Sequence, residues 1–132
     1  MSYDIKGKTV LVTGANRGIG KAIVEALLAQ GAKRIFAAAR DKSSLAELVA
    51  QSPSVVVPVA LDVTKASDIA NIASTIGQLD ILINNAGIAT GVLFGAETSL
   101  TIAAQEMATN YFGPLNLTHA LLPVLRQSSA AA

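Results

Sequence analysis

Short apolar runs alternate with helical patterns along the chain, and this alternation limits the folds that the sequence can adopt. Four runs are rich enough in Val, Ile, Leu and Ala to form buried strands, and they cover residues 9–13, 34–39, 55–61 and 79–84. Strands that are joined through helices pair in parallel, with right-handed crossovers. The sequence therefore predicts an α/β fold, a Rossmann-like doubly wound parallel sheet in three αβα layers with strand order 3-2-1-4.

The helices between these strands are marked by apolar spacing and by glycine stops. Apolar residues at i, i+3 and i+4 begin the first helix at Ile19, and Gly31 ends it. Ser44 and Glu47 fit a capping box that opens a short second helix, and Gly77 closes a third.

Two prolines predict where regular structure is interrupted. A final helical pattern runs from about residue 99 to 126 and contains Gly113-Pro114, where the lost backbone hydrogen bond predicts a kink. Pro58 lies in the third predicted strand and cannot donate to a sheet ladder. We therefore expect that strand at an edge of the sheet.

Composition indicates one globular domain that spans residues 1–132. Hydrophobic residues make up 52% of the chain and charged residues 14%, which is too apolar for a disordered segment. The formal net charge of +1 gives no basis for a nucleic-acid or membrane partner, and the absence of cysteine excludes disulfides and zinc–thiolate sites. Because no apolar run approaches the ~18–20 residues of a membrane span, we expect a cytoplasmic protein, and we assign no metal site.

The first predicted strand leads directly into a glycine-rich turn that reads Thr-Gly-Ala-Asn-Arg-Gly-Ile-Gly over residues 13–20. Glycines allow unusual backbone torsions and a close approach to a pyrophosphate, whose charge is favoured at a helix N-terminus. The spacing G-x-x-x-G-x-G differs from the general G-x-G-x-x-G fingerprint, and a tight turn without a ligand would use the same glycines. Cofactor contacts are predicted for Thr13, Gly14, Asn16, Arg17, Gly18, Ile19 and Gly20.

This turn resembles the T-G-x-x-x-G-x-G cofactor motif of the short-chain dehydrogenase/reductase family. Three further motifs match the family in order and spacing, namely Asp62-Val63, the run Asn-Asn-Ala-Gly over 84–87, and Asn110 within Asn-Tyr-Phe-Gly-Pro. The resemblance covers residues 7 to 126, so the chain is identified as a member of the classical type, most similar to small-molecule carbonyl reductases. It implies hydride transfer between a nicotinamide cofactor and a small-molecule carbonyl or alcohol.

The resemblance also implies roles for particular residues. Asp62 and Val63 would contact the adenine ring, although capping of the following turn also explains an aspartate here. Asn85, Ala86 and Gly87 would lie near the ribose, with a structural role for Asn85 kept open. Asn110 is the one residue of catalytic type, because its family counterpart helps to hold a water chain that leads to the catalytic lysine.

The residue after the second predicted strand bears on the choice of cofactor. An acid about 20 residues beyond the glycines would accept a hydrogen bond from the ribose 2′-hydroxyl of NAD, but Arg40 stands at this place. An arginine can pair bidentately with the 2′-phosphate of NADP, and Arg17 would supply a second cation. We therefore predict NADP(H) rather than NAD(H). Two alternatives stay open: that Asp41 reaches the ribose, and that Arg40 is an ordinary exposed arginine.

The chain contains no tyrosine with a lysine four residues later, which is the family's proton-transfer pair. Leu115 stands four residues after Tyr111, and Gly7 four residues after Tyr3. In the family the catalytic serine, tyrosine and lysine lie on a fifth strand and the helix after it, and this chain stops at Ala132. We therefore expect a fragment that lacks the catalytic half and is inactive alone.

Truncation before a fifth strand would leave the fourth strand as an exposed edge, which favours pairing with another chain. We expect a homo-oligomer that forms through the last helix or through this sheet edge. Two alternatives to an enzyme fragment stay open. One is a non-catalytic dinucleotide-binding module, natural or engineered, and the other is a remnant that no longer binds a cofactor.

Overall fold

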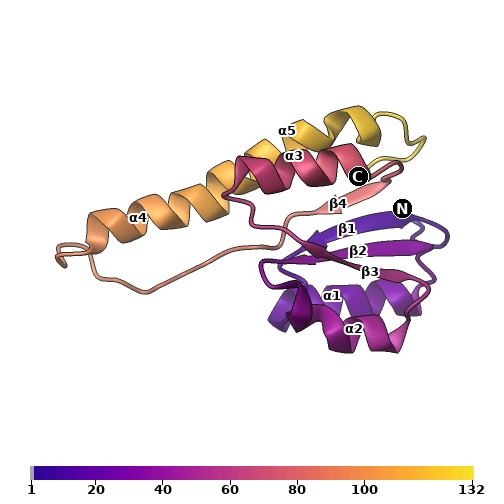
Figure 1. Ribbon diagram of the computed structural model, residues 1–132, viewed down its shortest axis with the longest axis horizontal. Helices are drawn as coiled ribbons and strands as arrows, with labels where there is room; N and C mark the ends of the chain where they lie inside the picture. Colours follow the sequence, from indigo (N-terminus) through magenta and orange to yellow (C-terminus); the bar gives the residue numbers. More distant parts are fainter. Residues whose placement is uncertain (1) are drawn as a thin grey trace.

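The computed structural model describes residues 2–132 and contains a four-stranded sheet of order β3-β2-β1-β4 (Figure 1). The strands are β1 (Thr9–Thr13), β2 (Arg34–Ala39), β3 (Val56–Ala60) and β4 (Ile81–Ile83). Every pair in the sheet is parallel. The predicted strand order and parallel pairing are confirmed, and so is the edge position of the strand that contains Pro58.

Helices cover both faces of the sheet, as the three-layer prediction required (Figure 1). The α-helices are α1 (Gly18–Ala29), α2 (Ala46–Gln51), α3 (Ala66–Thr75), α4 (Ser99–Met107) and α5 (Gly113–Leu125). A 3₁₀ turn, η1 (Lys42–Leu45), precedes α2, and a π turn, η2 (Ala108–Phe112), joins α4 to α5. None of the helices that the structure describes over residues 2–132 is long and apolar enough to cross a membrane.

Two hydrophobic cores lie on opposite faces of the sheet because side chains alternate along each strand. Val10 and Val12 of β1 pack with α1 and α2, whereas Leu11 packs with α3 and α5. All three side chains are fully buried, since β1 is covered on both faces. Burial of each such side chain stabilises the fold by about 2 kcal/mol. This central strand therefore gives the segments at its carboxyl end a rigid base.

The predicted capping box is wrong. The carboxylate of Asp41 caps η1 by accepting a hydrogen bond from the Ser43 backbone N–H at 2.9 Å, and no side chain caps α2. The Ser44 hydroxyl donates instead to the Asp41 carbonyl at 2.5 Å. An aspartate two residues before the first free amide can form this short turn, so it takes the place that the pattern assigned to Ser44.

β4 is shorter than the predicted strand over 79–84. Asn84 and Asn85 leave the ladder, and their side chains bond outside the strand, with Asn84 donating to the Thr118 hydroxyl at 3.1 Å. The polar residues after Ile83 therefore join the strand end to its neighbours rather than extend the sheet.

The predicted interruption of the last helix is present as the π turn η2 rather than as a kink at one residue. Pro114 has no N–H to donate to the preceding turn, and a wider turn accommodates this loss. Gly113 allows close packing here, because an added Cβ would lie 2.7 Å from Cγ2 of Val63. The break thus coincides with a contact between α5 and the segment that follows β3.

The outer edge of β4 is not wholly bare, which corrects the expectation of an exposed edge. The Ala132 N–H donates to the Asp80 carbonyl and the Leu82 N–H donates to the Ala132 carbonyl, each at 2.9 Å. This is the pattern of a parallel neighbour, and it covers the start of the strand. Self-association through the last helix or the sheet edge stays a prediction.

Candidate functional site

A cavity of about 700 Å³ lies at the carboxyl ends of the parallel strands. The register aligns these ends, since Thr13 pairs with Ala38 and Ala39 with Ala60. In doubly wound sheets, ligands bind beyond this edge where the strand order reverses, here between β1 and β4. Its volume falls within the ~300–1,000 Å³ of typical ligand sites.

Most of the predicted site residues line this cavity, and three do not. The lining residues among them are Gly14, Asn16, Arg17, Gly18, Ile19, Arg40, Asp62, Val63, Asn85, Ala86 and Gly87. Thr13, Gly20 and Asn110 are not among the lining residues, but each contacts a residue that is.

The three motif glycines of the turn after β1 are required for different reasons. Gly14 has φ +63°, and an added Cβ would lie 3.0 Å from Cα of Ala86. Gly18 has φ +53° and nothing within 4 Å of that position, so its backbone borders open space. Gly20 begins the packing of α1 on the turn, because an added Cβ would lie 2.0 Å from the Gly14 carbonyl oxygen. The motif therefore combines turn geometry with close helix packing.

The N-terminus of α1 faces the cavity without an anionic side chain. Arg17 is the capping residue, its side chain makes no capping hydrogen bond, and the first turn contains no acidic residue. Backbone amides in the first turn of a helix are free to bind a ligand, and the helix dipole favours negative charge there. The turn is thus suited to an anion such as a pyrophosphate.

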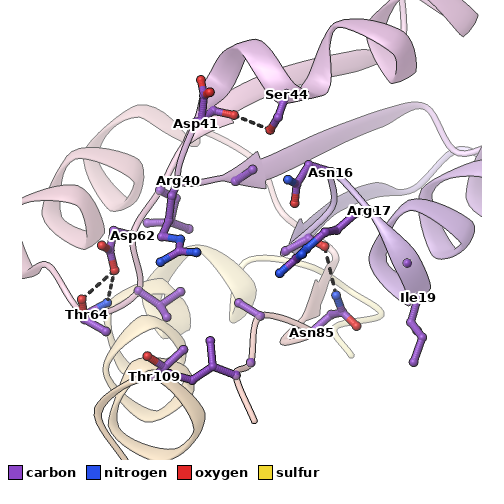
Figure 2. A pocket seen from close by; sticks show the side chains of 18 residues that line it. Asn16, Arg17, Ile19, Arg40, Asp41, Ser44, Asp62, Thr64, Asn85 and Thr109 are labelled. Atoms are coloured by element: carbon purple, nitrogen blue, oxygen red, sulfur yellow. Dashed lines mark hydrogen bonds between the residues drawn. The ribbon is translucent and has the colours of Figure 1, made fainter. Parts of the chain in front are cut away.

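Arg17 and Arg40 bring two positive charges to this cavity. Figure 2 shows their guanidinium groups pointing into the same space from the turn after β1 and from the end of β2. Within residues 2–132 the only side-chain ion pair is Lys21–Glu47, so neither guanidinium forms an ion pair with a carboxylate. Two unpaired guanidinium groups beside a helix N-terminus favour a ligand with several negative charges.

Asp62 lines the cavity and also caps the turn that follows β3. Its Oδ1 atom accepts hydrogen bonds from the Thr64 N–H at 2.9 Å and from the Thr64 hydroxyl at 2.6 Å. The Thr64 hydroxyl is the main cause that lowers the pKa of Asp62, and the charges of Lys65 and Arg40 lower it further. Both roles that the sequence left open for Asp62, capping and a place at the site, are therefore compatible.

Thr13 and Asn85 fasten the glycine turn to the segment after β4. The buried Thr13 hydroxyl oxygen accepts hydrogen bonds from the N–H groups of Asn85, at 3.0 Å, and Ala86, at 2.9 Å. The Asn85 side-chain amide donates to the Thr13 carbonyl at 3.1 Å and to the Gly14 carbonyl at 3.2 Å. Figure 2 shows Asn85 beside the glycine turn, with one of its hydrogen bonds dashed. The side-chain NH₂ group of Asn85 thus donates to backbone carbonyls of the protein, while the neighbouring residues Ala86 and Gly87 border the cavity.

Asn110 acts on the cavity through Ile88. Its Oδ1 atom accepts a hydrogen bond from the Ile88 N–H at 2.8 Å, and its Nδ2 donates to the Ile88 carbonyl at 2.7 Å. One helical turn earlier, Glu106 accepts hydrogen bonds from the N–H and the hydroxyl of Thr90, each at 2.8 Å. These bonds lower the pKa of Glu106.

Because Ile88 lines the cavity, the two hydrogen bonds between Asn110 and Ile88 make Asn110 a positioning residue for this part of the cavity wall.

A comparison with models of protein families identifies the family of this chain. The family model described as short chain dehydrogenase matches residues 8–132. The chain belongs to the short-chain dehydrogenase family. Its parallel sheet with flanking helices is thus the Rossmann-like fold of a short-chain dehydrogenase, present in part.

Several relatives are longer than this short-chain dehydrogenase chain. It is 35% identical to a short chain dehydrogenase, pigC, of Monascus ruber, and covers 48% of that protein with 100% of its own length. It is 37% identical, with a TM-score of 0.88, to a short chain dehydrogenase from Burkholderia cenocepacia in complex with NADP, covering 97% of this chain and 52% of that one. The chain thus spans about half the length of these relatives.

A further solved structure shows the other nicotinamide cofactor. It is a 3-ketoacyl-(acyl-carrier-protein) reductase from Brucella melitensis complexed with NADH, 27% identical, with a TM-score of 0.82. The alignment covers 93% of this chain and 52% of the Brucella melitensis chain. Similar proteins therefore bind NADP or NADH, and the choice between them depends on the residues of this chain.

Sequence reasoning missed part of the short-chain dehydrogenase cavity. Most missed residues adjoin a predicted one, and that proximity was the available signal. Thr109 comes from the π turn, whose wider spacing no apolar pattern indicates. The lining residues not predicted as cofactor contacts are Ala39, Asp41, Ser44, Leu61, Thr64, Ile88 and Thr109.

Proposed function

We propose that this chain is the NADP(H)-binding part of a short-chain dehydrogenase that transfers hydride between nicotinamide and a small-molecule carbonyl or alcohol. One observation carries the choice of cofactor, namely the two unpaired guanidinium groups of Arg17 and Arg40 in one cavity. A 2′-phosphate gives NADP(H) more negative charge than NAD(H) at the adenosine end. The relative from Burkholderia cenocepacia in complex with NADP supports this choice.

The proposed roles follow the order of the lining segments. The turn at Gly14, Gly18 and Ile19 would hold the pyrophosphate through its backbone amides. Arg40 would pair with the 2′-phosphate, with Arg17 as the second cation. Asp62 and Val63 would flank the adenine, and Asn85 to Gly87 would lie near the ribose.

The proposal separates cofactor binding from turnover. Bound nicotinamide supplies the hydride, and a positioned acid or base must move a proton, which contributes roughly 10²–10⁴-fold to the rate. Within these 132 residues neither tyrosine is followed by lysine at the required distance. We therefore propose that the chain binds NADP(H) without reducing a carbonyl by itself, and that Asn110 assists catalysis in the whole protein by positioning its neighbours.

Titration of the purified chain with NADPH and NADH, followed by nucleotide fluorescence, tests this proposal. We expect saturable binding with NADPH preferred, and we expect Arg40→Asp to weaken NADPH about tenfold or more, since a charge-assisted contact is lost. Arg34→Asp is the matched control, because Arg34 is exposed at the opposite end of the same strand. Equal weakening of both nucleotides by Arg40→Asp would contradict the assignment of Arg40 to the 2′-phosphate.

A second measurement tests the separation of binding from turnover. Incubation of the chain with NADPH and a simple aldehyde should leave the 340 nm absorbance unchanged. Steady consumption of NADPH above the protein-free rate would contradict the proposal. Failure to bind either nucleotide at millimolar concentration would instead favour a remnant that no longer binds a cofactor.

A further inference from the structure

Two neighbouring residues at the end of β2 would favour opposite cofactors. Arg40 suits a 2′-phosphate, whereas a carboxylate at this place suits the free 2′-hydroxyl of NAD(H) and repels a phosphate. Both Arg40 and Asp41 line the cavity. The preference of the site therefore depends on where the Asp41 carboxylate is directed.

Hydrogen bonds to Ser43 fix the direction of the Asp41 carboxylate. Its Oδ1 atom accepts from the Ser43 N–H at 2.9 Å and from the Ser43 hydroxyl at 2.7 Å. Figure 2 shows the Asp41 side chain directed toward the helix that follows, and the Arg40 guanidinium directed into the cavity. The two side chains thus diverge although they are adjacent in sequence.

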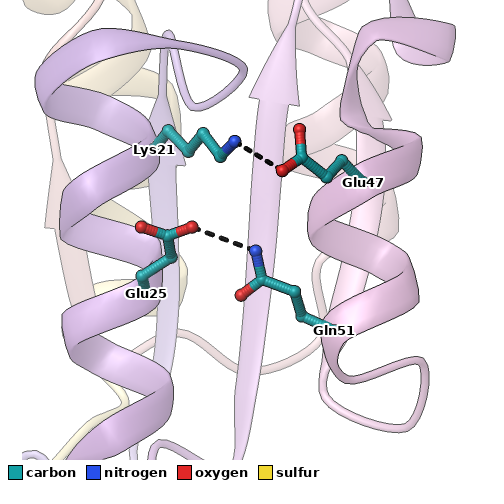
Figure 3. A network of polar contacts seen from close by, with 4 residues as sticks. All are labelled: Lys21, Glu25, Glu47 and Gln51. Carbon is teal, nitrogen blue, oxygen red and sulfur yellow. Dashed lines mark hydrogen bonds and ion pairs between the residues drawn. The ribbon is translucent and has the colours of Figure 1, made fainter.

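The element that carries Ser43 is itself held in place. Leu45, the last residue of η1, is fully buried in the core. Two polar contacts join α2 to α1, namely Lys21 with Glu47 at 2.9 Å and Glu25 with Gln51 at 3.0 Å (Figure 3). The backbone of η1, which places the Ser43 hydroxyl beside Asp41, is therefore anchored to the rest of the fold.

We infer that Ser43 is a specificity-determining residue, which holds the Asp41 carboxylate away from the ribose 2′ position so that Arg40 alone acts on it. This inference rests on the proposed function, because it concerns the preference of the same cofactor site. The hydrogen bonds from Ser43 also lower the pKa of Asp41, because they stabilise its charged form. When released, the carboxylate would accept a hydrogen bond from the 2′-hydroxyl of NADH and repel the 2′-phosphate of NADPH.

The test compares the ratio of the NADH and NADPH dissociation constants in the wild-type chain and in four variants. Ser43→Ala removes the hydroxyl bond and keeps the backbone N–H bond, so the carboxylate is held less firmly. The ratio should then fall roughly fivefold, the effect of one net hydrogen bond, with NADPH weakened and NADH strengthened. Ser54→Ala, an exposed serine away from the cavity, should leave the ratio unchanged. In an Asp41→Asn background, Ser43→Ala should no longer change the ratio, because no carboxylate remains to be released.

The outcomes separate this inference from the proposed function. A wild-type chain that prefers NADPH, with an unchanged ratio in Ser43→Ala, overturns the role of Ser43 and leaves the proposed function intact. A fall in the ratio that persists in the Asp41→Asn background overturns it as well, since Ser43 would then act without Asp41. A wild-type chain that binds neither nucleotide overturns the proposed function, and this inference with it.

Discussion

β1 and α4 each support a segment beside the cavity without lining it, but their environments differ. All five residues of β1 are buried, whereas α4 has no buried residue. Figure 1 shows β1 between its neighbours in the sheet and α4 extending away from it. Leu100 of α4 is 78% exposed, and Leu93 and Phe94 in the preceding loop are 81% and 98% exposed. A helix outside the core can therefore still hold the segment beside a cavity, as Glu106 of α4 does through Thr90.

The glycine turn after β1 and the segment after Gly87 are stabilised by different kinds of contact. The glycine turn rests on buried side chains and on the Thr13–Asn85 contacts, whereas the segment after Gly87 depends on polar contacts from the helix. Glu106 and Asn110 are four residues apart on the helix, and Thr90 and Ile88 are two apart on an extended segment. These spacings correspond to ~6.0 Å and ~6.6 Å, so the two pairs fit side by side.

The contrast between core and exposed positions can be tested within one helix, where we expect the largest effect. Leu117→Ala should lower the free energy of unfolding by about 3 kcal/mol, because Leu117 is fully buried and a cavity would remain. Leu115→Ala should change it by less than about 0.5 kcal/mol, because Leu115 is 53% exposed. Urea unfolding followed by circular dichroism measures both. Equal losses of unfolding free energy in the two variants would contradict the conclusion that only one face of α5 packs in the core.

The glycine turn offers the next largest effect. Gly20→Ala should lower the free energy of unfolding by about 2 kcal/mol, because the new Cβ would overlap the Gly14 carbonyl. NADPH binding should weaken in the same variant. Gly77→Ala is the matched control, since Gly77 has no atom within 4 Å of the added carbon. A stable Gly20→Ala variant with unchanged affinity would show that the turn is more adaptable than its packing indicates.

A smaller, local effect is expected from Asn110→Ala. Loss of its two hydrogen bonds should raise the exchange rate of the Ile88 amide, with a change of about 1 kcal/mol in local opening. Amides in β1 should exchange as in the wild type. Asn116→Ala, an exposed asparagine on α5, serves as the control. Faster exchange throughout the sheet would mean that the two regions are not separately stabilised.

The smallest expected effect is the response of two carboxylates, Asp80 and Glu106, to a fall in pH. Asp80 is 7% exposed, and hydrogen bonds from the Ser128 hydroxyl and the Thr9 N–H lower its pKa. Because the folded pKa lies below the unfolded value of about 3.9, this stability is present above that value and is lost as the pH falls through the folded pKa. We expect a loss on the order of 1 kcal/mol between about pH 5 and pH 3. Asp80→Asn should flatten this part of the profile, with Asp4→Asn as the control.

Glu106 provides the counterpart in the exposed region. Thr90 lowers the pKa of Glu106, so acid should break the contact without unfolding the sheet. The Thr90 amide resonance should shift with pH, and this shift should disappear in Glu106→Gln. A simultaneous loss of β1 resonances would contradict the independence of the two regions.

Local patterns predicted the fold better than the precise roles within the site. Strand order followed from the alternation of strands and helices, and the edge position of Pro58 followed from its missing N–H. The role of Gly20 in packing, by contrast, depends on the carbonyl of Gly14, a contact that no spacing reports. The cap at Asp41 and the π turn at Thr109 each arose where two local preferences competed, and tertiary packing decided between them.

The contact between Thr13 and the residues after β4 has a consequence for the order of folding. The Thr13 hydroxyl bonds to amides that lie 72 and 73 positions further along the chain. Closure of a loop of this length costs entropy before the contact repays it. The glycine turn can therefore reach its final shape only after β4 has joined β1, although its own residues are among the first to be synthesised.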